Sequence, residues 1–265
     1  VQLNPFEVKS GEDRGYYASN TLAGTRMNSK IEDLAASITV VTKQQLTDTA
    51  AIDINDIFLY EANTMGASQF SDYSIDRTGT LIDGNQDNAA SANRVRGTTA
   101  ANTARGNFAT NSRIPIDAYN IESVEISRGS NSTLFGLGNP SGTVNINTGR
   151  ANLTRESSTV TIRGDDWGGY RGSIDLSRPI IRDKLAVRFS AVYDDKGFIR
   201  KPSTDISRRQ TGTVSYRPFK NTTIRGSYEH YSQERRPPNT QTPRDFVTQW
   251  IAAGKPTWDP IRRQS

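Results

Sequence analysis

The chain has 265 residues, 34% of them hydrophobic and 23% charged, with a net charge of +5 and a mean hydropathy of -0.66. It has no cysteine and one histidine, His230, which excludes disulfides, thiolate metal sites and sites built from several histidines. No stretch approaches the roughly 18 consecutive apolar residues of a transmembrane helix, and the scattered basic residues form no footprint for nucleic acid.

The N-terminal part of the chain predicts a polar arm, one strand and two short helices. Residues 1–30 are polar with little apolar periodicity, so we expect an extended, mobile arm. SITVVT (37–42) predicts a strand, and the T-x-x-Q spacing of Thr42 and Gln45 is a capping box that starts a helix around 43–49. Asp53 is expected to cap a second helix, whose apolar face comprises Ile54, Ile57 and Phe58.

The next part of the chain alternates between long polar segments and short strands. Residues 62–94 and 98–113 are rich in Gly, Ser, Asn and Asp and predict loops, separated by a short strand at NRVRG. Asp117 is expected to cap a short helical turn, followed by strands at ESVEISRG (122–129) and GTVNINT. Residues 31–150 therefore predict a small mixed α+β domain with long polar loops.

After residue 150, apolar and polar residues alternate with the period of a β-strand. In KLAVRFSAVYDD, Val187 and Phe189 share one face, while Arg188 and Ser190 share the other. Such segments are about as long as the roughly 9–11 residues of a membrane-spanning strand, but strands of soluble sheets alternate as well. Alternation alone leaves both classes open for the five predicted strands, 158–164, 169–177, 184–195, 209–217 and 222–231.

The connections between these strands supply a second criterion. Those at 178–184 and 217–222 are compact, whereas those at 165–169 and 196–207 and the segment from Gln233 onward are polar or long. The longer connections therefore fall on one edge of the sheet. Outer-membrane barrels have short periplasmic turns and longer external loops, so this parity favours the membrane class.

The glycines near residue 140 do not form a nucleotide site. Gly136, Gly138 and Gly142 have the spacing G-x-G-x-x-x-G, and Pro140 with an alternating run follows where a dinucleotide fold would open a helix. We expect these glycines to permit tight turns and close backbone approach. Because no catalytic set, cofactor motif or calcium loop is present either, the sequence predicts a protein that is not an enzyme and has no cofactor, catalytic residue or metal site.

Two arginines, Arg96 and Arg128, each end a strand-like run and precede a glycine. They are either strand-end arginines in solvent or arginines inserted against carboxylates of a second domain. In the second case a bidentate pair would fix the position of one domain on the other.

Several of these segments match one family in order. IESVEISRGSNSTLFGLGNPSGTVNINT (121–148) resembles the terminal motif of the plug domain of TonB-dependent outer-membrane receptors, and SITVVTKQQL, DINDIF and VRG resemble its earlier motifs. The resemblance covers about residues 31–150, with Pro140 and Ser141 departing from the usual glycine spacing. The motif residues that fit are Ile121, Glu122, Val124, Glu125, Arg128, Gly129, Leu134, Phe135, Gly136, Gly138, Gly142, Val144, Asn145 and Thr148.

The resemblance implies an α+β plug domain followed by antiparallel transmembrane β-barrel strands, about 5 of roughly 22 being present. Residues 1–30 would be a periplasmic arm, 31–150 the plug, and 151–265 the N-terminal part of an incomplete barrel in the bacterial outer membrane. The chain would then be a piece of a longer protein. The candidate TonB box lies in PFEVKS, at Pro5, Phe6, Glu7 and Val8.

The implied function is active import of a scarce ligand, either a siderophore–metal complex or an oligosaccharide. The implied partners are TonB with its inner-membrane motor complex, the lipid of the outer membrane and the small ligand, without nucleic acid. Arg96, Arg128 and Glu125 would contact the barrel, and the residues expected to face the ligand are Tyr73, Arg77, Asn85, Asn88, Arg105 and Asn107. A non-transporting adhesin or glycan-binding surface protein stays open as the alternative.

Overall fold

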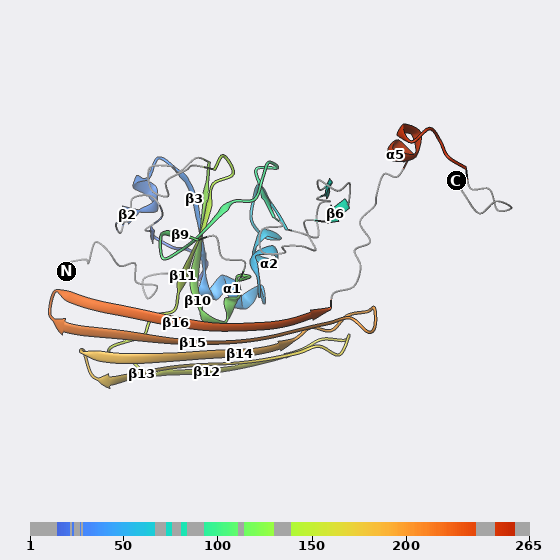
Figure 1. Cartoon of the computed structure of the whole chain (residues 1–265). Coiled ribbons are helices and arrows are strands. Elements are labelled where there is room, and N and C mark those ends of the chain that lie inside the picture. Colours follow the sequence, from blue (N-terminus) through green and yellow to red (C-terminus); the bar gives the residue numbers. More distant parts are fainter. Residues whose placement is uncertain are drawn as a thin grey trace.

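The computed structural model describes residues 15–21, 23, 27, 29–66, 73–75, 81–83, 93–110, 114–129, 139–236 and 247–257. The described residues up to 150 form an α+β unit, the N-terminal domain, which stands over one face of a second sheet (Figure 1). That second sheet contains five long antiparallel strands and is called the long-strand sheet. No helix within the described ranges is long and apolar enough to cross a membrane. The predicted fold class is confirmed.

The N-terminal domain is built on a five-stranded sheet. Its order is β3 (Ser37–Thr42), β10 (Ile121–Arg128), β11 (Thr143–Thr148), β8 (Asn102–Arg105) and β9 (Phe108–Thr110). β10 lies antiparallel to both β3 and β11, and β8 runs parallel to β11. The strands predicted for β3, β10 and β11 are confirmed. β8 and β9 are a correction, because the sequence predicts a loop there; the polar strand NTAR is stabilised by pairing with β11 rather than by its own apolar pattern.

Two short helices cover this sheet as predicted. α1 (Lys43–Asp48) begins at Thr42, whose Oγ1 accepts a hydrogen bond from the Gln45 amide at 3.2 Å. α2 (Ile54–Phe58) begins at Asp53, which forms a reciprocal capping box with Asp56. Their apolar faces meet the sheet in one core, made of Val41, Leu46, Ala51, Ile54, Ile57, Phe58, Val95, Ile116, Ile121, Val124, Ile126, Val144 and Ile146.

The domain also contains two 3-10 helices, η2 (Ile31–Asp33), which has no buried residue, and η4 (Ala118–Asn120). The predicted cap of η4 is confirmed, since Asp117 accepts a hydrogen bond from the Tyr119 amide at 3.0 Å. The segment predicted as loop between residues 62 and 94 contains short paired strands, another correction. β4 (Thr64–Met65) pairs with β7 (Arg94–Val95), and β5 (Tyr73–Ile75) pairs with β6 (Leu81–Asp83).

Part of the predicted N-terminal arm is packed on the domain. β1 (Asn20–Thr21) pairs with β2 (Ser29–Lys30), and Thr21 is 0% exposed. Its Oγ1 donates a hydrogen bond of 2.8 Å to Glu125 in β10. Residues 15–21 are therefore tied to the sheet, which corrects the expectation of an arm that is mobile throughout 1–30.

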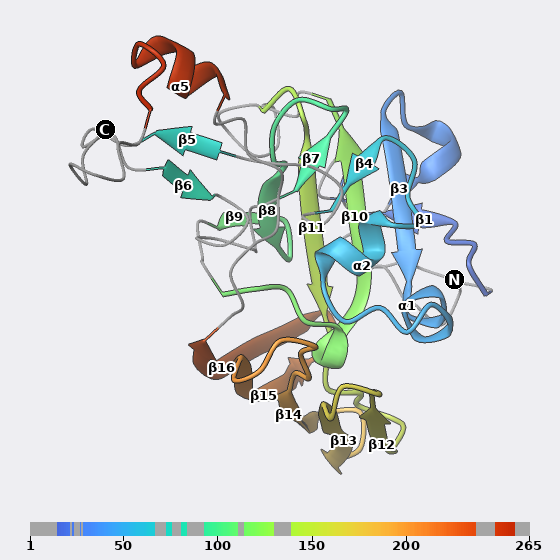
Figure 2. The same cartoon turned by 90° about the vertical axis from the view of Figure 1, so that its right-hand side faces the viewer.

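The long-strand sheet contains β12 (Ser157–Gly164), β13 (Tyr170–Ile181), β14 (Leu185–Asp195), β15 (Thr204–Phe219) and β16 (Thr222–Arg236), paired in chain order. All five predicted strands are confirmed, and most are longer than predicted. β13 continues past Pro179 through a register shift, and β15 begins at Thr204, inside a predicted loop. Figure 2 shows these strands below the N-terminal domain, and α5 (Val247–Ala252) follows them in the chain.

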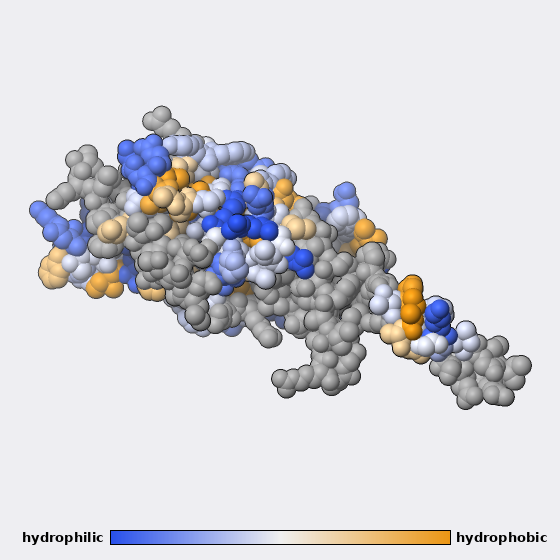
Figure 3. Space-filling view, turned by 90° about the horizontal axis from the view of Figure 1, so that it is seen from above, coloured by the Kyte–Doolittle hydropathy of each residue, from blue (hydrophilic) through white to orange (hydrophobic). Residues whose placement is uncertain are grey.

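The two faces of the long-strand sheet differ as the alternation predicts. Side chains turned toward the N-terminal domain are mainly polar or charged and are buried along β14 and β15, such as Arg188, Ser190 and Thr211. The opposite face exposes apolar residues, among them Ile162, Phe189 and Ile224. Seen from the other side, the described surface of the N-terminal domain is mainly hydrophilic, with apolar atoms in separate small patches (Figure 3). The long-strand sheet is therefore polar inside and apolar outside.

Candidate functional site

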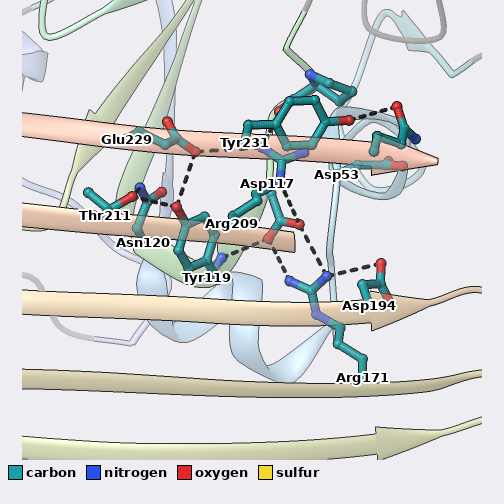
Figure 4. Close-up of polar contacts among 12 residues, drawn as sticks. Asp53, Asp117, Tyr119, Asn120, Arg171, Asp194, Arg209, Thr211, Glu229 and Tyr231 are labelled. Carbon is teal, nitrogen blue, oxygen red and sulfur yellow. Dashed lines mark hydrogen bonds and ion pairs between the residues drawn. The ribbon is translucent and has the colours of Figure 1, made fainter. Parts of the chain in front are cut away.

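The candidate site is the contact between the N-terminal domain and the polar face of the long-strand sheet. Its centre is Asp117, whose backbone continues into η4 (Figure 4). Asp117 Oδ1 lies 2.5 Å from Arg171 Nη2, and Asp117 Oδ2 lies 3.1 Å from Arg171 Nη1. Arg171 also pairs with Asp194 of the neighbouring strand at 3.2 Å. This bidentate, charge-assisted geometry fixes both the distance and the orientation of η4 relative to the sheet.

A second arginine, Arg209, reaches the same region from β15. Its Nη1 donates to the carbonyl oxygen of Pro115 at 2.8 Å, and its side chain is 4% exposed. Its Nε makes no hydrogen bond and lies 3.7 Å from Asp117 Oδ2. The guanidinium stacks on the ring of Tyr231, 4.4 Å from the centroid. Arg209 therefore contacts the backbone at Pro115 and the side chain of Asp117 at the same time.

Glu229 on β16 collects donors from the N-terminal domain. It accepts hydrogen bonds from Arg105 Nη1 at 2.8 Å and from the Tyr119 hydroxyl at 3.1 Å. The Tyr119 hydroxyl also bonds to Thr211 Oγ1, which accepts from Asn120 Nδ2 at 3.1 Å. Burial raises the pKa of Tyr119 above its ordinary value, so its hydroxyl stays protonated and available as a donor.

Arg188 on β14 organises a second group of charges beside the first. Its Nε and Nη2 each lie 2.7 Å from oxygens of Asp175, and its Nη1 lies 2.7 Å from Glu122 of β10. Ser190 adds a hydrogen bond of 2.8 Å to Asp175. The guanidinium occupies the space beside Gly149, where a Cβ would lie 1.7 Å from Nη1. Gly149 is therefore required for this close approach.

The direction of these ion pairs was not predicted. The sequence predicts arginines of the N-terminal domain against carboxylates of the barrel, whereas here Arg171, Arg188 and Arg209 of the sheet hold Asp117 and Glu122. Arg105 with Glu229 is a pair of the predicted direction. The three sheet arginines all occupy polar positions of the alternating strands, which was the only signal for them in the sequence.

The two predicted contact arginines lie elsewhere in the N-terminal domain. Arg128 pairs with Glu61 at 3.4 Å and donates to Thr39 Oγ1 at 2.6 Å. Arg96 has a positive φ of 59°, and its backbone amide donates to Asn63 at 2.8 Å. Their predicted contact with barrel carboxylates outside this chain stays a prediction.

Glu125 lies inside the N-terminal domain and is 1% exposed. It accepts hydrogen bonds of 2.8 Å from Thr21 Oγ1 and from Asn145 Nδ2. These bonds connect β1, β10 and β11. The predicted contact of Glu125 with the barrel also stays a prediction.

Two residues predicted to face the ligand have described side chains. Arg105 forms the ion pair with Glu229, so it contacts the sheet. Asn107 is buried, and its backbone amide donates to Asn145 at 2.8 Å. Tyr73 belongs to β5, and its side chain is not described. The remaining predicted residues lie outside the described residues: Arg77, Asn85 and Asn88 of the loops and Pro5, Phe6, Glu7 and Val8 of the candidate TonB box.

Gly142, the last glycine of the motif, allows the close backbone approach that the sequence predicts. Gly142 has a φ of +102°, and a Cβ there would lie 1.9 Å from the carbonyl oxygen of Ser127. The neighbouring Ser141, a departure from the usual spacing, is buried and bonds to Thr98 and Thr99. Gly142 therefore permits close approach of backbone. Among the described residues no group of three or more metal-ligating side chains gathers.

Comparisons with known proteins agree with this arrangement. The family model described as TonB-dependent Receptor Plug Domain matches residues 30–143. Over 72% of its length the chain is 32% identical to the metal-pseudopaline receptor CntO of Pseudomonas aeruginosa, and over 70% it is 30% identical to the ferripyoverdine receptor of that species. The solved pyoverdine outer membrane receptor FpvA from Pseudomonas aeruginosa, bound to pyoverdine, superposes with a TM-score of 0.69 at 19% identity, covering 87% of this chain and 32% of that one. The chain spans about a quarter of the length of the curated relatives, 25% of the first and 22% of the second.

Proposed function

Since this chain belongs to the family of TonB-dependent receptors, with the N-terminal domain as its plug and the long-strand sheet as the first strands of its barrel, we propose that it imports a ligand across the bacterial outer membrane. Import would be active, with the plug closing the barrel until force moves it. The protein would be a transporter rather than an enzyme.

The observation that carries this proposal is the polar contact between plug and barrel. Arg171, Arg188 and Arg209 meet Asp117 and Glu122 through ion pairs rather than through an apolar core. When such a contact opens, water solvates the separated charges, so separation costs less than exposing an apolar interface of the same area. When the contact is closed, the same ion pairs fix one position of the plug relative to the barrel. A contact of this kind suits a plug that must both seal the barrel and move.

Force would enter through the N-terminal arm. We propose that Pro5, Phe6, Glu7 and Val8 add as a strand to TonB in the periplasm, a β-augmentation. The arm continues into residues 15–21, where Thr21 bonds to Glu125 in strand β10 of the plug sheet. A pull on the arm would therefore act directly on β10, which leads back to η4 and its ion pairs. This arrangement supports an N-terminus in the periplasm and a motor complex in the inner membrane.

The ligand would be a metal complexed by a small organic chelator. The names of two relatives, a metal-pseudopaline receptor and a ferripyoverdine receptor, support this class over an oligosaccharide. We propose that the loops that contain Tyr73, Arg77, Asn85 and Asn88 face it from the plug. We do not include Arg105 and Asn107 among the ligand-facing residues. Arg105 contacts the barrel strand β16, and Asn107 contacts the plug strand β11.

Transport is tested by uptake of radiolabelled ferripyoverdine and of a radiolabelled metal–pseudopaline complex into cells that express the complete receptor. Deletion of residues 5–8 is expected to abolish uptake while surface binding persists, and a protonophore is expected to do the same. A deletion variant that takes up the complex like the wild type would overturn the box assignment. Binding without energy-dependent uptake in the wild type would favour the non-transporting surface protein instead.

A further inference from the structure

The apolar face of the long-strand sheet carries an arginine, Arg208, that lies over an aromatic ring. Arg208 on β15 alternates with the buried Arg209 and so points away from the N-terminal domain. Its guanidinium lies over the ring of Tyr193, 5.4 Å from the centroid. In the part of the chain that the structure describes, Arg208 has no carboxylate within ion-pair distance; the outward Asp195 and Glu234 lie one row nearer the loops on the adjacent strands.

A comparison within the same face makes this arginine distinctive. Arg178, near the opposite end of the strands, also points outward, since it is paired with the outward Val187. It is neutralised by Glu156 at 3.8 Å and donates to Ser158 Oγ at 2.7 Å. Of these two outward arginines, Arg178 has a carboxylate partner and Arg208 has none among the described residues.

Aromatic rings hold Arg208 at a defined position. Tyr193 stacks on Tyr170, with ring centroids 5.5 Å apart and an interplanar angle of 20°. Their hydroxyls lie 3.4 Å apart. Tyrosines with a polar tip and an apolar body prefer the boundary between headgroups and acyl chains. The row of Tyr170, Tyr193 and Arg208 therefore has the composition of a membrane boundary.

An open hollow of about 410 Å³ lies directly beside this row. Its lining includes Ile162, Ile174, Tyr193 and Arg208, and Gly172 lies among them. A Cβ at Gly172 would meet no atom within 4 Å, so the glycine leaves space that no neighbour fills. The hollow is thus apolar along the strands and cationic at the end nearer the long loops.

We propose that Arg208, Tyr193 and the hollow at Gly172 bind one anionic lipid of the membrane, with its phosphate on Arg208 and an acyl chain in the hollow. The guanidinium supplies charge-assisted hydrogen bonds to phosphate, and the hollow supplies contact area that a free anion would not use. This inference rests on the proposed membrane placement of the sheet, but not on the ligand or on the energy coupling.

The test is native mass spectrometry of the complete receptor in detergent, titrated with dioleoyl phosphatidylglycerol or with dioleoyl phosphatidylcholine. The wild type is expected to hold one phosphatidylglycerol more tightly than phosphatidylcholine. Arg208→Gln is expected to lower phosphatidylglycerol affinity by about tenfold, the loss of one charged hydrogen-bonded contact. Gly172→Leu, which fills the hollow, is expected to weaken both lipids, whereas Arg178→Gln is the matched control and should keep the preference.

Equal affinity of wild type and Arg208→Gln for phosphatidylglycerol would overturn the proposal. Full displacement of the lipid by millimolar inorganic phosphate would overturn it as well, because the site would then recognise a free anion. Uptake of the metal complexes is measured in the same variants. Lost lipid preference with normal uptake supports the lipid site, and normal uptake with no lipid preference in the wild type refutes that site while leaving the transport function intact.

Discussion

Asp117 and Arg171 face each other across the contact between plug and barrel, joined by two hydrogen bonds of 2.5 and 3.1 Å. The same Asp117 carboxylate caps η4 and lies 3.7 Å from Arg209. One side chain thus caps the start of η4 and also pairs the two domains.

Asp117→Asn separates the two roles of Asp117. Asparagine is as good an N-cap as aspartate, so η4 should persist, while Arg171 keeps Asp194 and Arg209 keeps Glu229 but both lose the charge of Asp117. Because each guanidinium keeps a second carboxylate, we expect a loss of about 1–3 kcal/mol in the stability of the contact. Protection of residues 114–122 from amide hydrogen exchange in the complete receptor measures it. Lys30→Gln, in an exposed ion pair with Glu32, is the control and should change little.

Gly149→Ala places a methyl group where the Arg188 guanidinium lies. The arginine has to leave Glu122 or Asp175, so we expect a cost of about 1–3 kcal/mol from overpacking. A crystal structure of the variant should show Arg188 moved. Gly212→Ala is the matched control, because a Cβ at that position would meet nothing within 4 Å. An Arg188 that keeps its position in the Gly149→Ala variant would contradict the assignment of Gly149 as a packing requirement.

Thr21→Val keeps the shape of the side chain and removes its hydroxyl. The carboxylate of Glu125 then loses a donor in a buried position, which costs about 1–3 kcal/mol. Residues 15–21 should become more accessible to limited proteolysis, while the long-strand sheet stays protected. Ser29→Ala, which removes an exposed hydroxyl of the partner strand, tests whether any loss of a hydroxyl in this pair has the same effect. Equal sensitivity of both variants would argue against a special role for Thr21.

Asp53 gives the N-terminal domain a dependence on pH. Burial raises its pKa, followed by repulsion from Asp56. A carboxyl group whose pKa is higher in the folded state favours folding while protonated, so its contribution falls as pH rises from about 4 through the folded pKa. Asp53→Asn keeps the cap and removes the ionisation, and should flatten the pH dependence of hydrogen exchange in α2. A variant with the same slope as the wild type would exclude Asp53 as its source.

Local patterns were sufficient for the elements themselves. The T-x-x-Q of Thr42 and Gln45 and the cap at Asp53 predicted both helices, because a helix start depends on a few neighbouring residues. Alternation predicted which face of each long strand is polar, because successive side chains of a strand point to opposite sides. The polar strands β8 and β9 were missed, since β8 pairs with β11, a strand about 40 residues away in sequence, and β9 pairs in turn with β8.

The order of residues along the chain was thus enough to identify a plug followed by barrel strands, to find five alternating strands, and to place Arg188 on the polar face of its strand. Arg171 and Arg209 lie on the polar faces of theirs. The packing of the two domains determines which carboxylates those arginines meet, and these come mainly from η4 and β10. Asp117 and Glu122 carry no periodic signal of partnership, because an ion pair between distant segments depends on how two domains dock. Docking brings together side chains 54 and 66 positions apart.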